Sequence, residues 1–188
     1  MSRHAEADGA LGAIEAAVWQ ELAQAARDRQ HPWRTPVLAT GLSDGADARV
    51  VVLREVDVPT RTLVFYTDTR SGKVDQLRQR PTGTVVMWSA ALGWQLRCRV
   101  QLSLDTQGVS VSSRWARMKL SPSAQDYLSP LPPGSVIDAP TLATWSREER
   151  GHFGVIYAGI DSLDWLELRP DGHRRARFDA QGARWLQP

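Results

Sequence analysis

The stretch RVVVLREVDVPTRTLVFYTDTRSGK, residues 49–73, decides the fold of the chain. Its β-branched and aromatic residues predict two strands, over residues 48–56 and 62–67, joined by a short polar link. The second strand enters a loop of hydroxyl, glycine and basic residues, 67–73, which leads into a short helix over residues 74–80. We therefore expect a strand, a loop and a helix to meet at this point.

This loop has the composition of an anion-binding site. Backbone N–H groups in the first turn of a helix have no intrahelical partner, and the helix dipole favours negative charge there. Lys73 would add a full charge, and Ser71 could cap the helix or donate to an anionic oxygen. From these residues alone, an ordinary helix cap followed by a solvated lysine is the alternative.

The composition fits a single domain in a reducing compartment. The chain has 188 residues, a net charge of +2 and one cysteine, Cys98, which excludes an internal disulfide. Cys98 lies in an alternating apolar run, so we expect a buried, inert thiol. The N-terminus lacks the order of a signal peptide, and no apolar run is long enough to span a membrane. These features predict a cytoplasmic protein with no membrane partner.

The remaining elements follow from periodicity and from helix- and strand-breaking residues. Apolar residues at helical spacing predict helices over residues 9–29 and 109–120. The proline-rich stretch 121–140 is expected to be a lid or an interface arm, and residues 142–150 one or two helical turns. Strands are predicted at 36–43, 84–89, 95–104, 153–160 and 162–168, and in a final hairpin of 173–178 and 184–186.

About seven short strands with helices between them and at the ends indicate a mainly β (α+β) fold. An antiparallel barrel with peripheral helices fits this order better than a parallel α/β sheet. We expect one domain over residues 1–188, with the barrel formed by 36–105 and 153–188 and a helical and loop insertion at 109–150.

Two predicted strands carry arginines, and the face of the sheet toward which each arginine points decides what it can bind. Arg49 and Arg54 are an odd number of residues apart, so regular pleating sends them to opposite faces unless a bulge intervenes. The strand over 95–104 alternates strictly, with a polar face that is either solvated or turned toward a partner subunit or a polar ligand. That face carries Gln95, Arg97, Arg99, Gln101 and Ser103.

The motifs of several enzyme classes are missing from the sequence. It has no H-E-x-x-H or C-x-x-C for a metal, no G-x-S-x-G, no P-loop and no G-x-G-x-x-G. We expect no metal site, exposed histidines at positions 31, 152 and 173, and a solvated pair, Glu148 and Glu149. No catalytic side chain is assigned. This inventory favours a protein whose chemistry is carried by a bound organic cofactor such as a flavin.

The ordered motifs resemble the pyridoxamine 5′-phosphate oxidase-like flavoproteins. The matching pieces are R-x-V-x-L-[KR] at residues 49–54, F-Y-T at 65–67, S-x-K at 71–73 and Q-x-R at 95–97. The resemblance covers residues 36–105 well and the C-terminal tail loosely.

The resemblance implies a Greek-key split barrel that forms a homodimer with FMN at the interface. It implies that Arg49 and Lys73 bind the FMN phosphate beside Ser71 and Gly72, and that the 49–54 strand lines the flavin. Gln95 and Arg97 would approach the flavin from the partner protomer. The complete set of cofactor-binding residues so predicted is Arg49, Val50, Val51, Val52, Leu53, Arg54, Tyr66, Thr67, Ser71, Gly72, Lys73, Gln95 and Arg97.

The sequence departs from this family pattern at the substrate side. Gly72 stands where the family often has arginine, and Arg54 replaces a lysine that contacts substrate phosphate. The tail arginines only approximate the family's R-x-H. A small anionic substrate is expected near Arg54, Arg174, Arg175 and Arg177. The sequence is more similar to the related FMN-binding branch than to the vitamin B6 oxidase.

Three other functions are compatible with the sequence. The barrel could be a flavin- or haem-binding module without turnover, or it could hold a deazaflavin in place of FMN. A nucleic-acid-binding barrel is disfavoured because the basic residues are spread along the chain rather than clustered.

Overall fold

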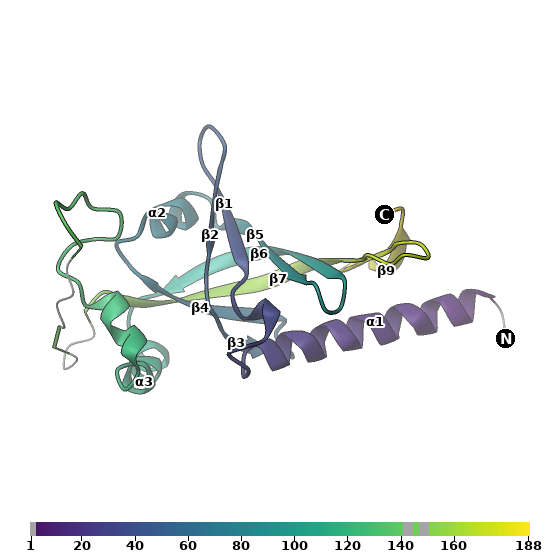
Figure 1. Cartoon of the computed structure of the whole chain (residues 1–188), viewed down its shortest axis with the longest axis horizontal. Helices are drawn as coiled ribbons and strands as arrows, with labels where there is room; N and C mark the ends of the chain where they lie inside the picture. Colours follow the sequence, from purple (N-terminus) through teal and green to yellow (C-terminus); the bar gives the residue numbers. More distant parts are fainter. Residues whose placement is uncertain (1–2, 141–144, 147–150) are drawn as a thin grey trace.

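A computed structural model describes residues 3–140, 145–146 and 151–188 of the chain. Figure 1 shows an elongated molecule built on a curled antiparallel sheet with peripheral helices. The helices are α1 (Arg3–Ala25), η1 (Pro32–Arg34), α2 (Gly72–Gln79), α3 (Val109–Met118) and η2 (Pro122–Tyr127). The strands are β1 (Val37–Gly41), β2 (Ala46–Val50), β3 (Leu53–Asp57), β4 (Thr62–Asp68), β5 (Thr82–Ser89), β6 (Trp94–Asp105), β7 (Phe153–Glu167), β8 (Arg174–Asp179) and β9 (Gly182–Leu186).

The sheet closes on itself through a very short connection. Its strand order is β2-β1-β5-β6-β7-β4-β3, so β2 and β3 lie at opposite ends of the path although they are consecutive in the chain. Only Val51 and Val52 join them, and the Val51 N–H donates to the carbonyl of Pro36 at 2.9 Å. The two ends of the sheet must therefore approach each other. This confirms the mainly β antiparallel fold expected from the sequence.

Two strand predictions were wrong for the same reason. The pattern of apolar residues along a strand does not reveal where that strand changes its pairing partner or its register. Residues 48–56 do not form one strand buried on both faces: the strand breaks at Val51, and Val50 is 65% exposed. Residues 153–168 form one strand, β7, rather than two. The pairing of β7 with β6 shifts register at Asp161, which a β-bulge accommodates.

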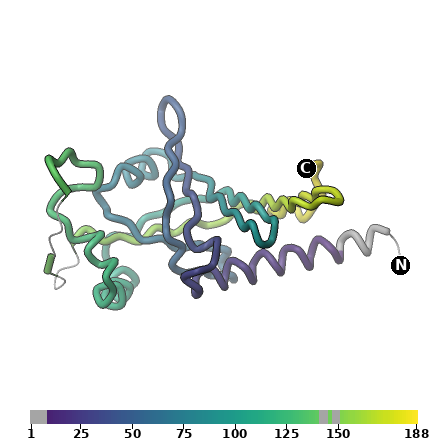
Figure 2. Tube along the Cα trace, viewed as in Figure 1, coloured from purple at the N-terminus to yellow at the C-terminus, as the bar shows by residue number. Residues whose placement is uncertain are grey.

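The main core lies between the inner face of the sheet and the helices α1 and η1. Apolar residues of α1 point into it, including Val18 and Leu22, which are fully buried. Trp33 of η1 is also fully buried, and its ring lies 6.4 Å from that of Trp94, which is 5.4 Å from Trp165. The tube in Figure 2 shows α1 lying along one side of the barrel, and α1 also contacts β9 of the C-terminal hairpin.

The segment that follows β6 forms a second, smaller core. Val111, Trp115 and Met118 of α3 pack with Tyr127 of η2 and Phe153 of β7. Beyond η2, residues 130–140 are all exposed and form a projecting arm. The helical turn predicted over 142–150 and the pair Glu148 and Glu149 lie outside the described residues.

His31 is buried, so the expectation that it is exposed was wrong. Its Nδ1 accepts a hydrogen bond from the Trp33 backbone N–H at 3.1 Å and caps η1. Its Nε2 lies 2.9 Å from Glu21 Oε2. The imidazole thereby connects α1 to the start of the barrel. Sequence pattern could not show this, because the partner Glu21 is on another element.

Cys98 is fully buried, as expected. Burial raises the pKa of its thiol to about 12, so the thiolate is not formed at neutral pH. None of the described helices is long and apolar enough to cross a bilayer.

We predict that Trp33→Ala lowers the free energy of unfolding by about 3–5 kcal/mol, because it removes a fully buried ring from the main core. The matched control is Trp88→Ala, whose side chain is 47% exposed and should cost less than about 1 kcal/mol. Urea denaturation followed by circular dichroism measures both. Equal losses would contradict the placement of Trp33 in the core.

Candidate functional site

The predicted anion loop follows β4 and leads into α2, as expected from the sequence. Thr67 and Ser71 are buried, and their hydroxyl oxygens lie 3.2 Å apart. Ser71 precedes the first residue of α2, but its side chain does not cap the helix. Instead its hydroxyl donates to the carbonyl of Asp68 at 2.8 Å. Both hydroxyls are thus held together at the helix N-terminus.

Lys73 is the cation of this loop that has no ion-pair partner among the described residues. Its Nζ lies 3.1 Å from Ser71 Oγ and 3.4 Å from Thr67 Oγ1, and within the described part of the chain it forms no ion pair with a carboxylate. Burial lowers the pKa of Lys73, and the positive charge of Arg49 lowers it further. A half-buried ammonium group beside two hydroxyls and a second cation is suited to bind an anionic group.

Arg49 of β2 is fixed against α2. Its guanidinium donates to Gln76 Oε1 at 2.8 Å, to the Leu38 carbonyl at 3.2 Å and to the carboxylate of Asp47. Hydrogen bonds from Gln76 and Arg49 lower the pKa of Asp47. Asp47 forms an ion pair with Arg49, whereas the charges of Asp68 and Asp47 act on Lys73 without an ion pair among the described residues. If an anion binds at the loop, the Arg49 guanidinium would therefore donate hydrogen bonds both to that anion and to Asp47.

Arg54 reaches the same region from the opposite edge of the sheet. The pairing of β3 with β4 shifts register between Leu53 and Glu55, so Arg54 sits at an irregularity of the strand. The break after Val50 and this irregularity both interrupt the regular alternation of faces between Arg49 and Arg54. The Arg54 guanidinium stacks over the ring of Tyr66, 5.4 Å from its centroid, and its buried Nε finds no acceptor among the described residues.

Glu55 organises the side chains around Tyr66. It accepts a hydrogen bond from the Tyr66 hydroxyl at 3.0 Å and two from the Arg114 guanidinium, at 3.0 and 2.6 Å. Burial and the Glu55 charge raise the pKa of Tyr66 to about 12. Sequence analysis missed Glu55 and Arg114, because their pairing across 59 residues leaves no local signal. The pair borders a hollow of about 420 Å³ beside Thr62.

Arg70 is another residue that sequence analysis missed. It pairs with Asp68 at 2.7 Å and donates to the carbonyls of Ser129, at 2.8 Å, and Pro130, at 3.1 Å. The anion loop is thereby tied to the base of the 130–140 arm.

Within one chain, Gln95 and Arg97 form no hydrogen bond or ion pair with the described residues of this loop. Thr67 pairs with Gly154 near the start of β7, whereas Gln95 pairs with Leu166 near its end. Arg49 is closer to them: Leu38 and Val85 connect it to Cys98 across three strand spacings, or about 15 Å. The remaining predicted cofactor residues lie at the loop side: Val50 and Gly72 are exposed, Val52 is half-buried, and Val51 and Leu53 are buried.

Arg174, Arg175 and Arg177 also lie at the far end of the sheet, on β8, so one chain does not bring them near Arg54. Arg174 pairs with Glu167 at 2.7 Å and Arg175 with Asp164 at 2.8 Å. The predicted site thus consists of two groups of residues, one around the anion loop and one on β6 and β8.

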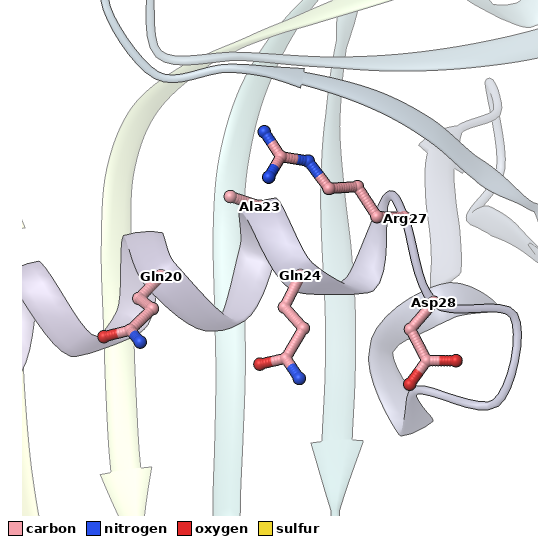
Figure 3. Close-up of a pocket in the computed structure, with 5 residues that line it drawn as sticks. All are labelled: Gln20, Ala23, Gln24, Arg27 and Asp28. Atoms are coloured by element: carbon pink, nitrogen blue, oxygen red, sulfur yellow. The ribbon is translucent and has the colours of Figure 1, made fainter.

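A hollow beside α1 lies apart from both groups of predicted site residues. A shallow hollow beside α1 is lined by residues of that helix and its end alone, and Figure 3 shows Arg27 pointing away from Gln20, Gln24 and Asp28. No group of three metal-ligating side chains is found among the described residues.

Solved structures of known proteins share this fold. The chain is 24% identical to a pyridoxamine 5′-phosphate oxidase-related, FMN binding protein from Nostoc punctiforme PCC 73102 (TM-score 0.71, covering 92% of this chain and 96% of that one). It is 19% identical to PhzG from Burkholderia lata 383 (TM-score 0.69, covering 94% and 92%). It is 14% identical to General Stress Protein 26 from Bacillus anthracis str. Sterne (TM-score 0.51, covering 78% and 91%). These likenesses confirm the split-barrel fold.

No protein of curated function matches the sequence. Residues 16–105, which include α1 from its middle, the anion loop and β6, match the family described as "Pyridoxamine 5'-phosphate oxidase, FMN-binding domain". The resemblance seen in the motifs is therefore confirmed over residues 16–105, which match the pyridoxamine 5′-phosphate oxidase FMN-binding domain family.

Proposed function

We propose that this protein is an FMN-dependent oxidoreductase whose anion loop binds the phosphate of FMN. The observation that carries the proposal is Lys73, a half-buried cation held by the hydroxyls of Ser71 and Thr67 without a carboxylate partner among the described residues. A phosphate monoester would supply the missing charge and acceptors for both hydroxyls. Arg49 would add a second cation, in exchange for part of its contact with Asp47.

When bound, FMN supplies hydride and electron transfer, so the side chains need only bind and orient it. Residues 50–53, Arg54 and Tyr66 are proposed to line the flavin. Because the pKa of Tyr66 is about 12, this residue keeps its proton at neutral pH and serves as a hydrogen-bond donor to Glu55. No side chain is assigned a catalytic proton transfer.

We further propose that the working unit is a homodimer. Among the described residues, Gln95 and Arg97 form no hydrogen bond or ion pair with residues 67–73, and the family resemblance would bring them to the flavin from a second copy. This arrangement would also bring the arginines of β8 toward Arg54. Two copies related by a two-fold axis would form two equivalent sites.

The proposed substrate is a small anionic molecule. Arg54 and the β8 arginines would favour a phosphate or a carboxylate. PhzG of Burkholderia lata 383 was solved in complex with tetrahydrophenazine-1-carboxylic acid, so carboxylated heteroaromatic compounds belong in a substrate screen. The buried Cys98 thiol fits a cytoplasmic location, which we also propose.

The freshly purified protein is expected to show flavin absorption bands and to release FMN on heating, identified by mass spectrometry. Bleaching of those bands by a reductant substrate under anaerobic conditions would establish turnover. A bound flavin that no donor reduces would indicate the non-catalytic module instead. A colourless protein that takes up neither FMN nor a deazaflavin would refute the proposal.

We predict that Lys73→Met weakens FMN binding by about 10- to 100-fold, because a charge-assisted bond to phosphate contributes about 1.5–3 kcal/mol. Arg49→Ala should also weaken it. The matched control is Arg78→Ala, an exposed α2 residue that pairs with Asp75 and should not matter. Quenching of FMN fluorescence on binding measures all three. Wild-type affinity in both Lys73→Met and Arg49→Ala would remove the anion loop from the FMN site.

FMN affinity is expected to fall at alkaline pH, starting below pH 10.5. The pKa of Lys73 in the ligand-free protein is lowered from that ordinary value, and the neutral amine that forms above its pKa cannot attract the phosphate. Lys73→Met should lack this alkaline loss, so the comparison isolates Lys73 from any titration of the flavin. Parallel pH profiles for the two proteins would show that Lys73 does not contact the phosphate.

A further inference from the structure

Arg70 connects the anion loop to a part of the chain that burial does not hold. Its guanidinium pairs with the buried carboxylate of Asp68 at 2.7 Å and donates to the backbone carbonyls of Ser129 at 2.8 Å and Pro130 at 3.1 Å. All residues of the arm, 130–140, are exposed, and Val136 is 98% exposed. Within the described part of the chain, the arm is therefore held at its base by hydrogen bonds rather than by packing in a core.

A second connection joins the same two segments through the backbone. The Thr69 N–H donates to the carbonyl of His152 at 2.8 Å, and the His152 N–H donates to the carbonyl of Tyr127 at 3.1 Å. Gly151, just before His152, approaches η2 so closely that an added Cβ would lie 2.6 Å from the Tyr127 carbonyl oxygen. The end of η2 and the base of the arm, residues 127–130, are thus held on the anion loop by two separate routes.

Asp68 belongs both to this connection and to the anion loop. Its carboxylate accepts hydrogen bonds from the Arg70 backbone N–H at 2.8 Å and from Arg70 Nε at 3.1 Å, and its carbonyl accepts one from the Ser71 hydroxyl at 2.8 Å. Burial and Arg49 lower the pKa of Lys73, and the negative charge of Asp68 acts in the opposite direction. An anion bound by Lys73 would be repelled by the same charge, and Arg70 reduces this repulsion while it stays paired with Asp68.

We propose that Arg70 is a positioning residue that couples phosphate binding at the anion loop to docking of the arm. The proposal rests on the proposed function for the identity of the anion, the phosphate of FMN. A bound phosphate adds negative charge near Asp68, which strengthens the attraction of Arg70 and favours the arrangement in which Arg70 also holds Ser129 and Pro130. Coupling between two equilibria is reciprocal, so a docked arm raises the affinity for phosphate.

The base of the arm also borders the proposed substrate side of the site. Burial raises the pKa of Asp126 and of Tyr127 in η2, and the charge of Arg54 lowers both. Arg54 therefore lies within electrostatic range of the segment that Arg70 holds. Docking of the arm would carry the effect of phosphate binding to residues beside Arg54.

The coupling is tested on the whole protein with a nitroxide label attached at Leu131→Cys, next to Pro130. Leu131 is 50% exposed, and the native Cys98 is fully buried, so only the introduced thiol is labelled. Electron paramagnetic resonance gives the ratio of mobile to immobile label, with FMN and inorganic phosphate as separate probes at constant ionic strength. Saturating FMN is expected to lower this ratio about fivefold or more, and phosphate should shift it in the same direction.

Variants of Arg70 separate its charge from its contacts with the arm. In Arg70→Gln the label should no longer respond to FMN, and FMN affinity should fall about fivefold. Arg70→Lys keeps the charge beside Asp68 but lacks the planar fork that reaches two carbonyls, so it should recover affinity without the arm response. If Arg70→Gln leaves Asp68 unpaired and does not fold, Asp68→Asn combined with Arg70→Gln removes both charges. Arg78→Gln is the matched control, because Arg78 pairs with Asp75 on the exposed side of α2 and should change neither measurement.

The outcomes distinguish this coupling from the proposed function. FMN binding that leaves the label equally mobile would overturn the coupling and leave the proposed function intact. An arm response that persists in Arg70→Gln would show that the anion acts by another route, and it would also overturn the coupling. If FMN does not bind but phosphate immobilises the label through Arg70, the proposed function fails and the coupling stands. If neither probe binds, both fail.

Discussion

The connection of β2 to β3 through only Val51 and Val52 constrains the whole structure. These strands are the two ends of the sheet path, and a two-residue link spans only about 10 Å even when extended. The sheet must therefore curl until its ends meet. Arg49, just before the link, and Arg54, just after it, are consequently brought to the same end of the barrel from opposite edges.

The electrostatics of that end follow from this closure. Arg49 is paired with Asp47, and Arg54 stacks on Tyr66, but Lys73 has hydroxyls rather than a carboxylate beside it. Burial and the proximity of Arg49 both disfavour its charged form. The fold thus keeps, at a helix N-terminus, a partly desolvated cation that has no ion-pair partner among the described residues, and an anion bound there would offset the cost of its burial.

Sequence reasoning predicted what depends on neighbouring residues and missed what depends on distant ones. Alternation identified the buried face of β6 and the buried Cys98, and composition identified the loop that ends at Lys73. The break at Val51 and the bulge at Asp161 were missed, because β-branched residues favour a strand without saying which strand it pairs with. Burial of His31 and the Glu55–Arg114 pair depend on partners in remote segments.

The bulge at Asp161 has a consequence for how the two ends of β7 can vary. Side chains alternate between the faces of a strand, so one inserted or deleted residue exchanges the faces of everything beyond it. Asp161 lies between the part of β7 that pairs with β4 and the part that pairs with β8. The bulge therefore determines which face of the sheet Asp164 and Leu166 point toward, whichever face Gly154 occupies. Lengthening β7 by an even number of residues would preserve this relation, whereas an odd number would require the loss of the bulge or a second one.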